Sequence, residues 1–500
     1  MTVDRTTRPL DQRPTYAAPQ PATQAGARPG ARPGREARIA GLDGVRAFAV
    51  AAVLAFHLHP DSLPGGFLGV DVFFVVSGFL ITTLLLREIR ATGRVHLGAF
   101  WTRRARRLLP ALVVVVLVGV SAARLIGGDL VVDIDRQVAG ALTFSTNWRE
   151  IAAGSSYFTD TAPLLLVTFW SLAVEEQFYL VWPVALVVLL ATVRSRRRRV
   201  AVPLVLAVAS AVAMAVLMVP GEDPTRVYYG TDTHAFGLMI GVCLALAFAA
   251  GGVGSPWSSP GRLRWRTPAG IAGLGVLVVL ALTLHEGSTF TYRGGLLLAS
   301  LATAVVIAAL LGGRSALVAA LEWRPLVWVG RRSYGIYLWH WPVVLVVAAV
   351  LPTAAPDSAA AWLGRGVALA LTLALAAASF RLVEEPVRRL GFRESARRIQ
   401  AALAVPWRVA RGPRLVAGLA VVLVATTAVA VATAPDQSAT ERAIEAGEAA
   451  LAADGAAVAA EALGADFSAP AGEDITAFGD SIMVTSLGGL NTRFPGIDIR

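Results

Sequence analysis

The sequence predicts an all-α polytopic membrane protein: a ten-helix transmembrane bundle, an eleventh span, and a short fragment of an extracytoplasmic α/β domain. Composition is the first reason, since 55% of the 500 residues are hydrophobic, 16% are charged and the mean hydropathy is +0.61. A soluble globular chain is about 45–50% apolar and about 25% charged. The other reasons are the long apolar runs and the placement of arginine between them. Together they exclude an ordinary cytosolic enzyme.

Apolar runs long enough to cross a bilayer recur along the chain. A transmembrane helix needs about 20 mainly apolar residues to span about 30 Å of hydrocarbon. Ten runs in the main body meet this length, at about 41–59, 67–87, 108–127, 163–192, 200–219, 232–250, 268–285, 294–312, 333–352 and 361–381, and an eleventh lies at about 414–434. Because the stretch 134–152 holds Asp135, Arg136, Asn147 and Arg149, we expect it to stay outside the membrane.

Arginine placement sets the expected orientation. The chain has no lysine, so all 45 basic residues are arginine. With the N-terminus inside and alternating sides, 36 arginines fall on inner segments and 9 on outer ones, as the positive-inside rule requires. A span at 134–152 would place the arginines of 196–199 outside. We therefore expect a multi-pass plasma-membrane protein with a cytoplasmic N-terminus and an extracytoplasmic C-terminus.

The segments around the spans complete the expected organisation. Residues 1–40 are rich in Pro, Gly, Ala, Gln and Arg without an apolar period, which predicts a disordered cytoplasmic arm rather than a signal peptide. The other expected boundaries are a membrane domain at 41–395, a cytoplasmic linker at 396–413, the eleventh helix at 414–434, an extracytoplasmic linker at 435–470 and the start of a further domain at 471–500.

Charge and metal-binding side chains exclude two further classes of function. The net charge of +11 would suit nucleic acid, but the arginines follow the bilayer, so we expect the lipid bilayer and not nucleic acid as a partner. The single cysteine, Cys243, excludes a disulfide framework and a multi-cysteine metal site. The six histidines include no His-x-x-x-His pair, and we expect no metal.

Arg46 and His57, both in the first apolar run, are the first candidate pair. Eleven helical steps bring them within about 20° of one face, about 16 Å apart along the axis. Ionisable groups inside a membrane are functional candidates, so we expect both to face one channel, with Arg46 towards the inner side. A buried structural histidine is the alternative for His57. His59, about 200° round from His57, suits the membrane interface.

An arginine cluster follows the second run. Arg103 and Arg107 are i,i+4 neighbours, and Arg104 and Arg107 are i,i+3 neighbours, so a helix would present one dense cationic face. Guanidinium groups suit phosphate oxygens. We assign these three arginines as candidate ligand-binding residues, with a topological anchor as the alternative.

Two acids stand in largely apolar surroundings. Asp71 is a lone acid in the second run, where it serves catalysis or pairs structurally with an arginine. Glu175 shares a helical face with Ser171 and is flanked by aromatic residues.

Two further channel candidates are Asp232, which leads into the sixth run, and His340, near the start of the ninth. Trp339 and Trp341 flank His340, so an interfacial aromatic belt is the alternative there.

Several of these segments, in this order, resemble the acyltransferase-3 family of multi-spanning O-acyltransferases. The segments are Arg-x10-His, GGFLGVDVFFVVSGFLIT, FWTRRARRLLP, WSLAVEEQFYLVWP, YYGTDTHAF, SYGIYLWHWP and VEEPVR. The resemblance covers about residues 40–395. One departure is His234, where the family pattern more often has arginine, which leaves the role of His234 open.

The resemblance implies transfer of an acyl group from cytoplasmic acyl-CoA to a hydroxyl of an envelope glycan or another extracytoplasmic acceptor. The expected donor is acetyl-CoA. By motif match, Arg46 and His57 are the family's essential pair. Arg104 and Arg107 match its arginine-x-x-arginine element for coenzyme A phosphates, and Glu175 matches the acid of its Ser-Leu-x-x-Glu motif. A neutral imidazole can take a hydroxyl proton, and whether His57 is a base or an acyl carrier stays open.

The tail carries a second resemblance. The segment Thr476–Met483 resembles the Gly-Asp-Ser block that opens an SGNH-type domain, with Ser481 as nucleophile, and such domains often follow the acyltransferase through an eleventh helix. A serine nucleophile needs a base, and no histidine follows His340. We therefore expect a truncated domain in which Ser481 is inactive.

A transporter or flippase that moves a glycan or an anion without chemistry is the competing class. We detect no internal repeat of the kind on which many transporters are built. The ordered motifs therefore favour the enzyme.

Overall fold

The computed structural model describes most of the chain between its two terminal regions. The described residues are 1–2, 39–157, 164–249, 260–311, 313–352, 355, 357–405, 411–439, 442, 476–477 and 498–499. Contacts divide the chain into residues 1–39 and 40–500, and the helices below belong to the second part. The expected arm at 1–40 (apart from its ends), most of the 435–470 linker and Ser481 lie outside the described residues.

Helices make up nearly all of the described chain. The longer ones are α1 (Leu42–Leu58), α2 (Gly69–Thr92), α3 (Leu97–Ile126), α6 (Phe169–Thr192), α7 (Arg196–Leu217), α10 (Phe236–Ala249), α11 (Pro260–Thr283), α12 (Leu296–Leu310), α14 (Arg324–Val350), α15 (Ala359–Ser379), α17 (Phe392–Ala404) and α18 (Arg411–Ala432). The shorter α-helices are α4 (Ile134–Thr143), α5 (Thr146–Ala153), α8 (Thr225–Tyr229), α9 (Thr231–His234), α13 (Ala316–Leu321) and α16 (Glu385–Leu390).

Single helical turns and one small strand pair complete the secondary structure. The 3₁₀ turns are η1 (Pro60–Ser62), η2 (Gly66–Leu68) and η3 (Gly128–Val131), and the π turns are η5 (Thr291–Gly295) and η6 (Phe380–Glu384). Strand β1 (Thr476–Ala477) pairs in parallel with β2 (Asp498–Ile499).

The predicted polytopic helical fold is confirmed. Within the described residues, ten helical segments are long and apolar enough to cross a membrane. α1 has 17 residues and covers the first expected run, so each predicted run contains a long helix among the described residues. The stretch 134–152 forms α4, with 10 residues, and α5, with 8. At 1.5 Å per residue neither helix is long enough to span about 30 Å of hydrocarbon.

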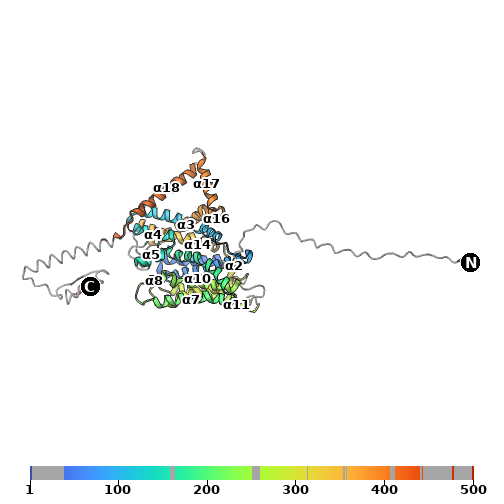
Figure 1. Cartoon of the computed structure of the whole chain (residues 1–500). Helices are drawn as coiled ribbons and strands as arrows, with labels where there is room; N and C mark the ends of the chain where they lie inside the picture. The colour runs from blue at the N-terminus through green and yellow to red at the C-terminus, as the bar shows by residue number, and fades with distance from the viewer. Residues whose placement is uncertain are drawn as a thin grey trace, which may run out of the picture. The chain divides into compact units, whose positions relative to one another are not determined.

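Burial distinguishes central helices from peripheral ones. In α2, 72% of the apolar window is buried, against 11% in α18. Figure 1 shows α18 along one edge of the bundle and α7 and α11 along the opposite edge, with α14, α2 and α10 between them. α2 is therefore an inner helix with protein on most sides, and α18 presents most of its apolar surface to lipid.

Glycines let the inner helices meet at backbone distance. A Cβ built at Gly78 on α2 would lie 2.0 Å from the carbonyl oxygen of Leu238 on α10. A Cβ at Gly241 on α10 would lie 2.2 Å from the carbonyl oxygen of Val75. These contacts are too short for any side chain, so α2 and α10 pack main chain against main chain, as small residues permit in membranes.

The first helix is held in the same way. A Cβ at Gly69 would lie 2.3 Å from the carbonyl oxygen of Ala49 on α1. At the start of α1, a Cβ at Gly330 on α14 would lie 1.8 Å from the carbonyl oxygen of Asp43. α1 is thereby fixed against both α2 and α14, and these three helices carry several of the candidate site residues.

We predict that Gly78→Ala destabilises the protein, because the added methyl group must force α2 and α10 apart. Overpacking of this kind costs about 1–3 kcal/mol, which thermal unfolding in detergent would detect as a lower midpoint. Gly275→Ala on α11 is the matched control, since a Cβ there meets nothing within 4 Å. An unchanged midpoint for Gly78→Ala would contradict the close packing.

Candidate active site

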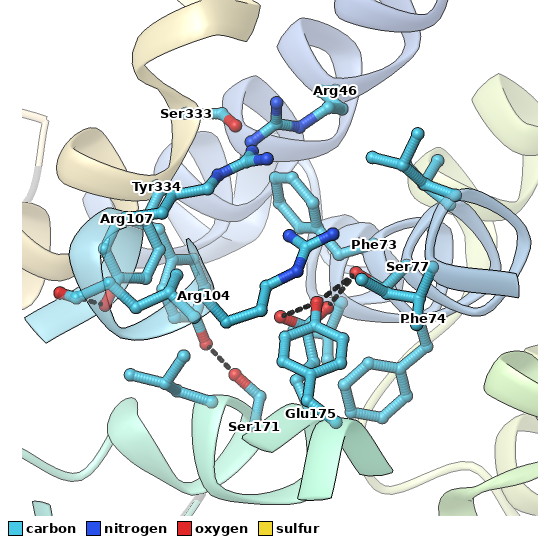
Figure 2. Close-up of a pocket in the computed structure, with 18 residues that line it drawn as sticks. Arg46, Phe73, Phe74, Ser77, Arg104, Arg107, Ser171, Glu175, Ser333 and Tyr334 are labelled. Atoms are coloured by element: carbon cyan, nitrogen blue, oxygen red, sulfur yellow. Dashed lines mark hydrogen bonds between the residues drawn. The ribbon is translucent and has the colours of Figure 1, made fainter. Parts of the chain in front are cut away.

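A pocket lies inside the bundle where α1, α2, α3, α6 and α14 come together. Its charged lining residues are Arg46, Arg104, Arg107 and Glu175. Figure 2 shows the three guanidinium groups entering this pocket from two different helices, with Glu175 below them. The family resemblance singled out these four residues by motif, and the fold brings them together in one pocket.

A hydrogen-bond network fixes the carboxylate of Glu175. Ser77 on α2 donates through Oγ to Oε1 of Glu175 at 2.6 Å. The Tyr179 hydroxyl lies 3.0 Å from Ser77 Oγ and 3.4 Å from the second carboxylate oxygen. Tyr179 lies one helical turn beyond Glu175 on α6, so two helices hold one carboxylate in a single orientation (Figure 2).

The pocket carries more positive than negative charge. Arg104 stacks over the Tyr179 ring, 5.3 Å from its centroid. The guanidinium of Arg46 lies 4.0 Å from the carboxylate of Asp43, the longest distance that counts as an ion pair. Asp43 is not among the lining residues of the pocket. Three arginines therefore face one carboxylate among the lining residues. Such an excess of forked donors suits an anion with several oxygens, such as a phosphate ester.

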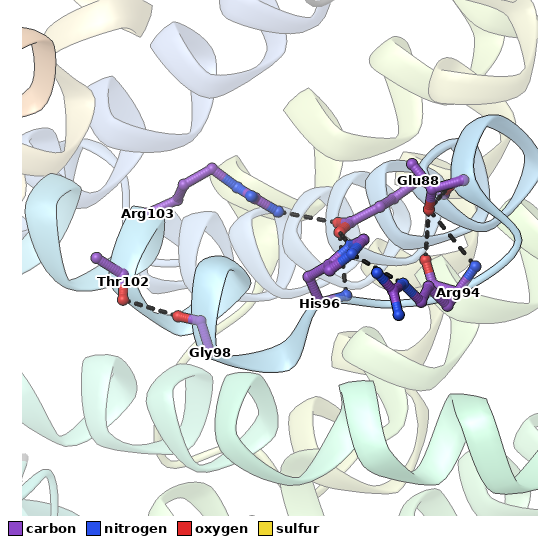
Figure 3. A network of polar contacts seen from close by, with 7 residues as sticks. Glu88, Arg94, His96, Gly98, Thr102 and Arg103 are labelled. Atoms are coloured by element: carbon purple, nitrogen blue, oxygen red, sulfur yellow. Dashed lines mark hydrogen bonds and ion pairs between the residues drawn. The ribbon is translucent and has the colours of Figure 1, made fainter.

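Arg103, predicted to share this cationic face, points elsewhere. Its guanidinium pairs with Glu88 on α2 at 2.9 Å, and its side chain is 52% exposed. Glu88 also binds the backbone N–H and the ring of His96, as Figure 3 shows. One residue of helix rotates a side chain by about 100°, so Arg104 and Arg107 reach the pocket while Arg103 is held by an acid at the helix end.

Tyr337 separates the pocket from a second layer of polar residues. Its hydroxyl is 2.6 Å from Ser171 Oγ and donates to the carbonyl of Thr168 at 3.0 Å. Its ring lines the pocket and also packs against His340, one turn along α14, with centroids 5.3 Å apart. Ser171 and Glu175 both line the pocket, so they share a face of α6 as predicted. The hydrogen bond to Ser171 holds the Tyr337 ring in this position.

His57 lies in the second layer, next to His340. The ring centroids of His57 and His340 are 5.0 Å apart, and the ring centroids of His57 and Trp341 are 4.9 Å apart. The Nδ1 atom of His57 binds the carbonyl of Val53 at 2.9 Å, and Nε2 lies 2.9 Å from the Tyr157 hydroxyl. Burial raises the pKa of Tyr157 well above its ordinary value. The hydroxyl therefore keeps its proton and donates to His57.

Asp71 lies outside the pocket lining, in a fully buried pair with His234. The two are 3.0 Å apart, and His234 Nδ1 also binds the carbonyl of Tyr228 at 2.7 Å. The sequence left open whether Asp71 serves catalysis or pairs with an arginine. The partner is His234, at the position where the family pattern more often has arginine, so the substitution retains a basic group.

Asp232 is also placed away from the pocket. Its side chain is 48% exposed and forms a two-pronged pair with Arg226, with contacts of 2.9 and 3.1 Å. Asp232 and His234 lie on one short helix, α9, but only His234 turns inward. His59, expected at an interface, stacks on Trp362 with centroids 5.1 Å apart.

Sequence reasoning missed four residues of these two layers. Ser77, Tyr179 and Tyr337 lie within the recognised segments, and their polar atoms in apolar helices were the available signal. Tyr157 carried no signal, because it follows the non-spanning stretch in a polar loop and reaches His57 only through the fold.

Comparison with known proteins shows which family the chain resembles. A family model described as an acyltransferase domain matches residues 39–381, which include both layers. No solved structure matches the chain.

Three curated relatives carry related names. A putative peptidoglycan O-acetyltransferase of Bacillus subtilis is 40% identical over 372 residues, 74% of this chain and 58% of the relative. A peptidoglycan O-acetyltransferase of Listeria monocytogenes is 38% identical, over 71% of this chain and 56% of the relative. A putative O-acetyltransferase of Staphylococcus aureus is 34% identical, over 71% of this chain and 58% of the relative. The chain thus matches less than two thirds of each relative's length.

We predict that Asp71 acts through stability. Asp71→Ala removes one partner of a buried pair, which costs about 3–5 kcal/mol, so thermal unfolding in detergent should occur at a clearly lower temperature. Asp71→Asn keeps an oxygen for the His234 ring and should retain transfer activity per folded molecule. Loss of transfer by a well-folded Asp71→Asn protein would instead make the carboxylate catalytic.

Proposed function

This chain belongs to the acyltransferase-3 family, and on that premise we propose that it is a membrane O-acyltransferase. The proposed reaction moves an acyl group from cytoplasmic acyl-CoA to a hydroxyl of an envelope glycan on the other side of the membrane. The names of the relatives favour acetyl as the group and peptidoglycan as the acceptor. The observation that carries the proposal is the pocket with three arginines, aligned with a layer that contains His57.

The donor end of the proposed reaction rests on Arg46, Arg104 and Arg107. Coenzyme A carries several phosphates, and buried guanidinium groups bind phosphate oxygens with charge-assisted hydrogen bonds. The excess positive charge of the pocket favours such a ligand over a neutral one. Glu175, held by Ser77 and Tyr179, orients the arginines by its single negative charge.

The acyl end of the proposed reaction lies at His57. Arg46 and His57 are eleven residues apart on one helix, about 16 Å along its axis. A thioester at the end of an extended arm can therefore reach His57 while its phosphates stay with the arginines. His57 Nε2, which already receives an O–H hydrogen bond from Tyr157, would take the proton of an attacking hydroxyl as a general base.

Orientation and the tail extend the proposal to the outer surface. The arginine count along the chain favours the pocket arginines on the cytoplasmic side and residues 435–500 outside. The block Gly479-Asp480-Ser481, which follows strand β1, is proposed as the nucleophile segment of an SGNH-type domain that hands the acyl group to the acceptor.

For donor binding, we predict that replacing Arg104 and Arg107 together by alanine weakens acyl-CoA binding at least about 100-fold, since hydrogen bonds to charged groups contribute about 1.5–3 kcal/mol each. Calorimetry on the purified protein would measure it. Acyl-pantetheine, which lacks the phosphates, should bind both proteins equally. Arg103→Ala is the control, because Arg103 binds Glu88 outside the pocket. Undiminished acyl-CoA binding by the double variant would mean that these arginines only anchor the helix at the membrane surface.

For the transfer step, we predict that His57→Asn lowers acyl transfer about 10²- to 10⁴-fold, the usual contribution of a general base. The asparagine amide keeps a donor for the Val53 carbonyl and loses only the Nε2 base, so acyl-CoA binding and thermal stability should stay unchanged. His59→Asn is the control, since His59 Nδ1 accepts from the backbone of Ser62, as an asparagine oxygen would. Normal transfer by folded His57→Asn protein would exclude this role.

A further inference from the structure

The inward face of α14 carries a second histidine whose basic nitrogen has no partner. His340 is 1% exposed, and its Nδ1 binds the carbonyl of Tyr337, three residues earlier on the same helix. Its Nε2 is buried and, within the described part of the chain, has no hydrogen-bond partner. Leaving a buried polar atom unpaired costs about 1–3 kcal/mol, so this atom calls for an explanation.

The hydrogen bonds fix where the protons of both rings lie. A carbonyl oxygen only accepts, so Nδ1 carries the hydrogen in His57 and in His340. Neither ring has a carboxylate within 4.0 Å among the described residues, and an unpaired buried imidazolium is costly. Both rings are therefore neutral, with the Nε2 lone pair available. His57 Nε2 accepts a hydrogen bond from the Tyr157 hydroxyl, and His340 Nε2 accepts none from the described residues.

The two rings differ in their neighbours on either side. His57 binds Tyr157, in the loop before α6, whereas His340 packs on Tyr337, which lines the arginine pocket. An arm that extends from the pocket thus passes Tyr337 and reaches the His340 side first. A hydroxyl that enters from the Tyr157 side reaches His57 first. The ring contact of 5.0 Å connects these two positions.

We propose that His340 is the general acid that returns a proton to the leaving sulfur, and that His57 and His340 work as a pair. The inference rests on the acyl-thioester donor proposed above. The acceptor O–H bond breaks and its proton goes to His57 Nε2, while the oxygen bonds to the acyl carbon to give a tetrahedral intermediate. The proton then passes to His340 Nε2 and on to sulfur as the C–S bond breaks, which releases the thiol and the ester.

This division of labour gives His340 Nε2 a role. The Tyr337 carbonyl accepts from Nδ1 and fixes the ring. The lone pair of Nε2, which no described protein group binds, accepts the proton that His57 releases.

The test compares His340→Asn, His57→Asn and the control His59→Asn in the full-length protein. Asparagine keeps an N–H donor for the Tyr337 carbonyl and loses the Nε2 atom, so His340→Asn should elute and unfold thermally like wild type. With acyl-CoA, its kcat should fall about 100-fold. With p-nitrophenyl acetate, whose leaving group departs without a proton, its kcat should stay within a few-fold of wild type. His57→Asn should lose transfer from both donors.

Each other outcome overturns the inference. A His340→Asn protein with normal kcat from acyl-CoA would make the residue structural, and an equal loss with both donors would make it a second base or a packing residue. Where wild type does not accept the nitrophenyl ester, His340→Ala decides: added imidazole should restore its transfer from acyl-CoA and should not restore that of His340→Asn. Absence of rescue in folded His340→Ala protein overturns the proposal. Failure of wild type to use acyl-CoA would instead contradict the proposed function.

Discussion

Backbone contact between α2 and its neighbours α1 and α10 is the constraint on which the rest of the structure depends. The contacts occur at Gly69, Gly78 and Gly241, where a side chain has no room. They place Ser77, beside Gly78, against Glu175, and Asp71, two residues after Gly69, against His234. In a bilayer, lipid solvates apolar side chains as well as protein does, so close main-chain packing rather than apolar burial specifies which helices meet.

Once the helices are placed, charge is sorted into two layers. The arginines and Glu175 share the pocket, and the imidazoles lie beyond Tyr337 with no acid beside them in the described chain. Buried charges need partners and neutral rings need only hydrogen bonds. The separation therefore places the guanidinium groups at one end of the site and the neutral imidazoles at the other.

Much of this arrangement could be predicted from the sequence. The apolar runs predicted the helices, because their length matches the thickness of a bilayer. The eleven-residue spacing of Arg46 and His57 predicted a common helical face, because this follows from helical geometry alone. Arg103 and Asp232 were assigned from local spacing, and each is held away from the pocket by an ion partner, Glu88 or Arg226. Tyr157 could not be predicted, because a loop residue reaches its partner through the fold and leaves no periodic trace in the sequence.

The position of the Tyr337 ring bears on how the membrane potential is preserved. Its hydroxyl is tied to Ser171 and to the Thr168 carbonyl, and its ring lies between Phe73 and His340. A route that carries an acyl group across a membrane must not also conduct ions, since each charge that crosses dissipates about 2.3 kcal/mol per 100 mV of membrane potential. In the proposed route, the Tyr337 ring lies between the arginine pocket and His340 as an apolar barrier to ions when no acyl arm occupies the route.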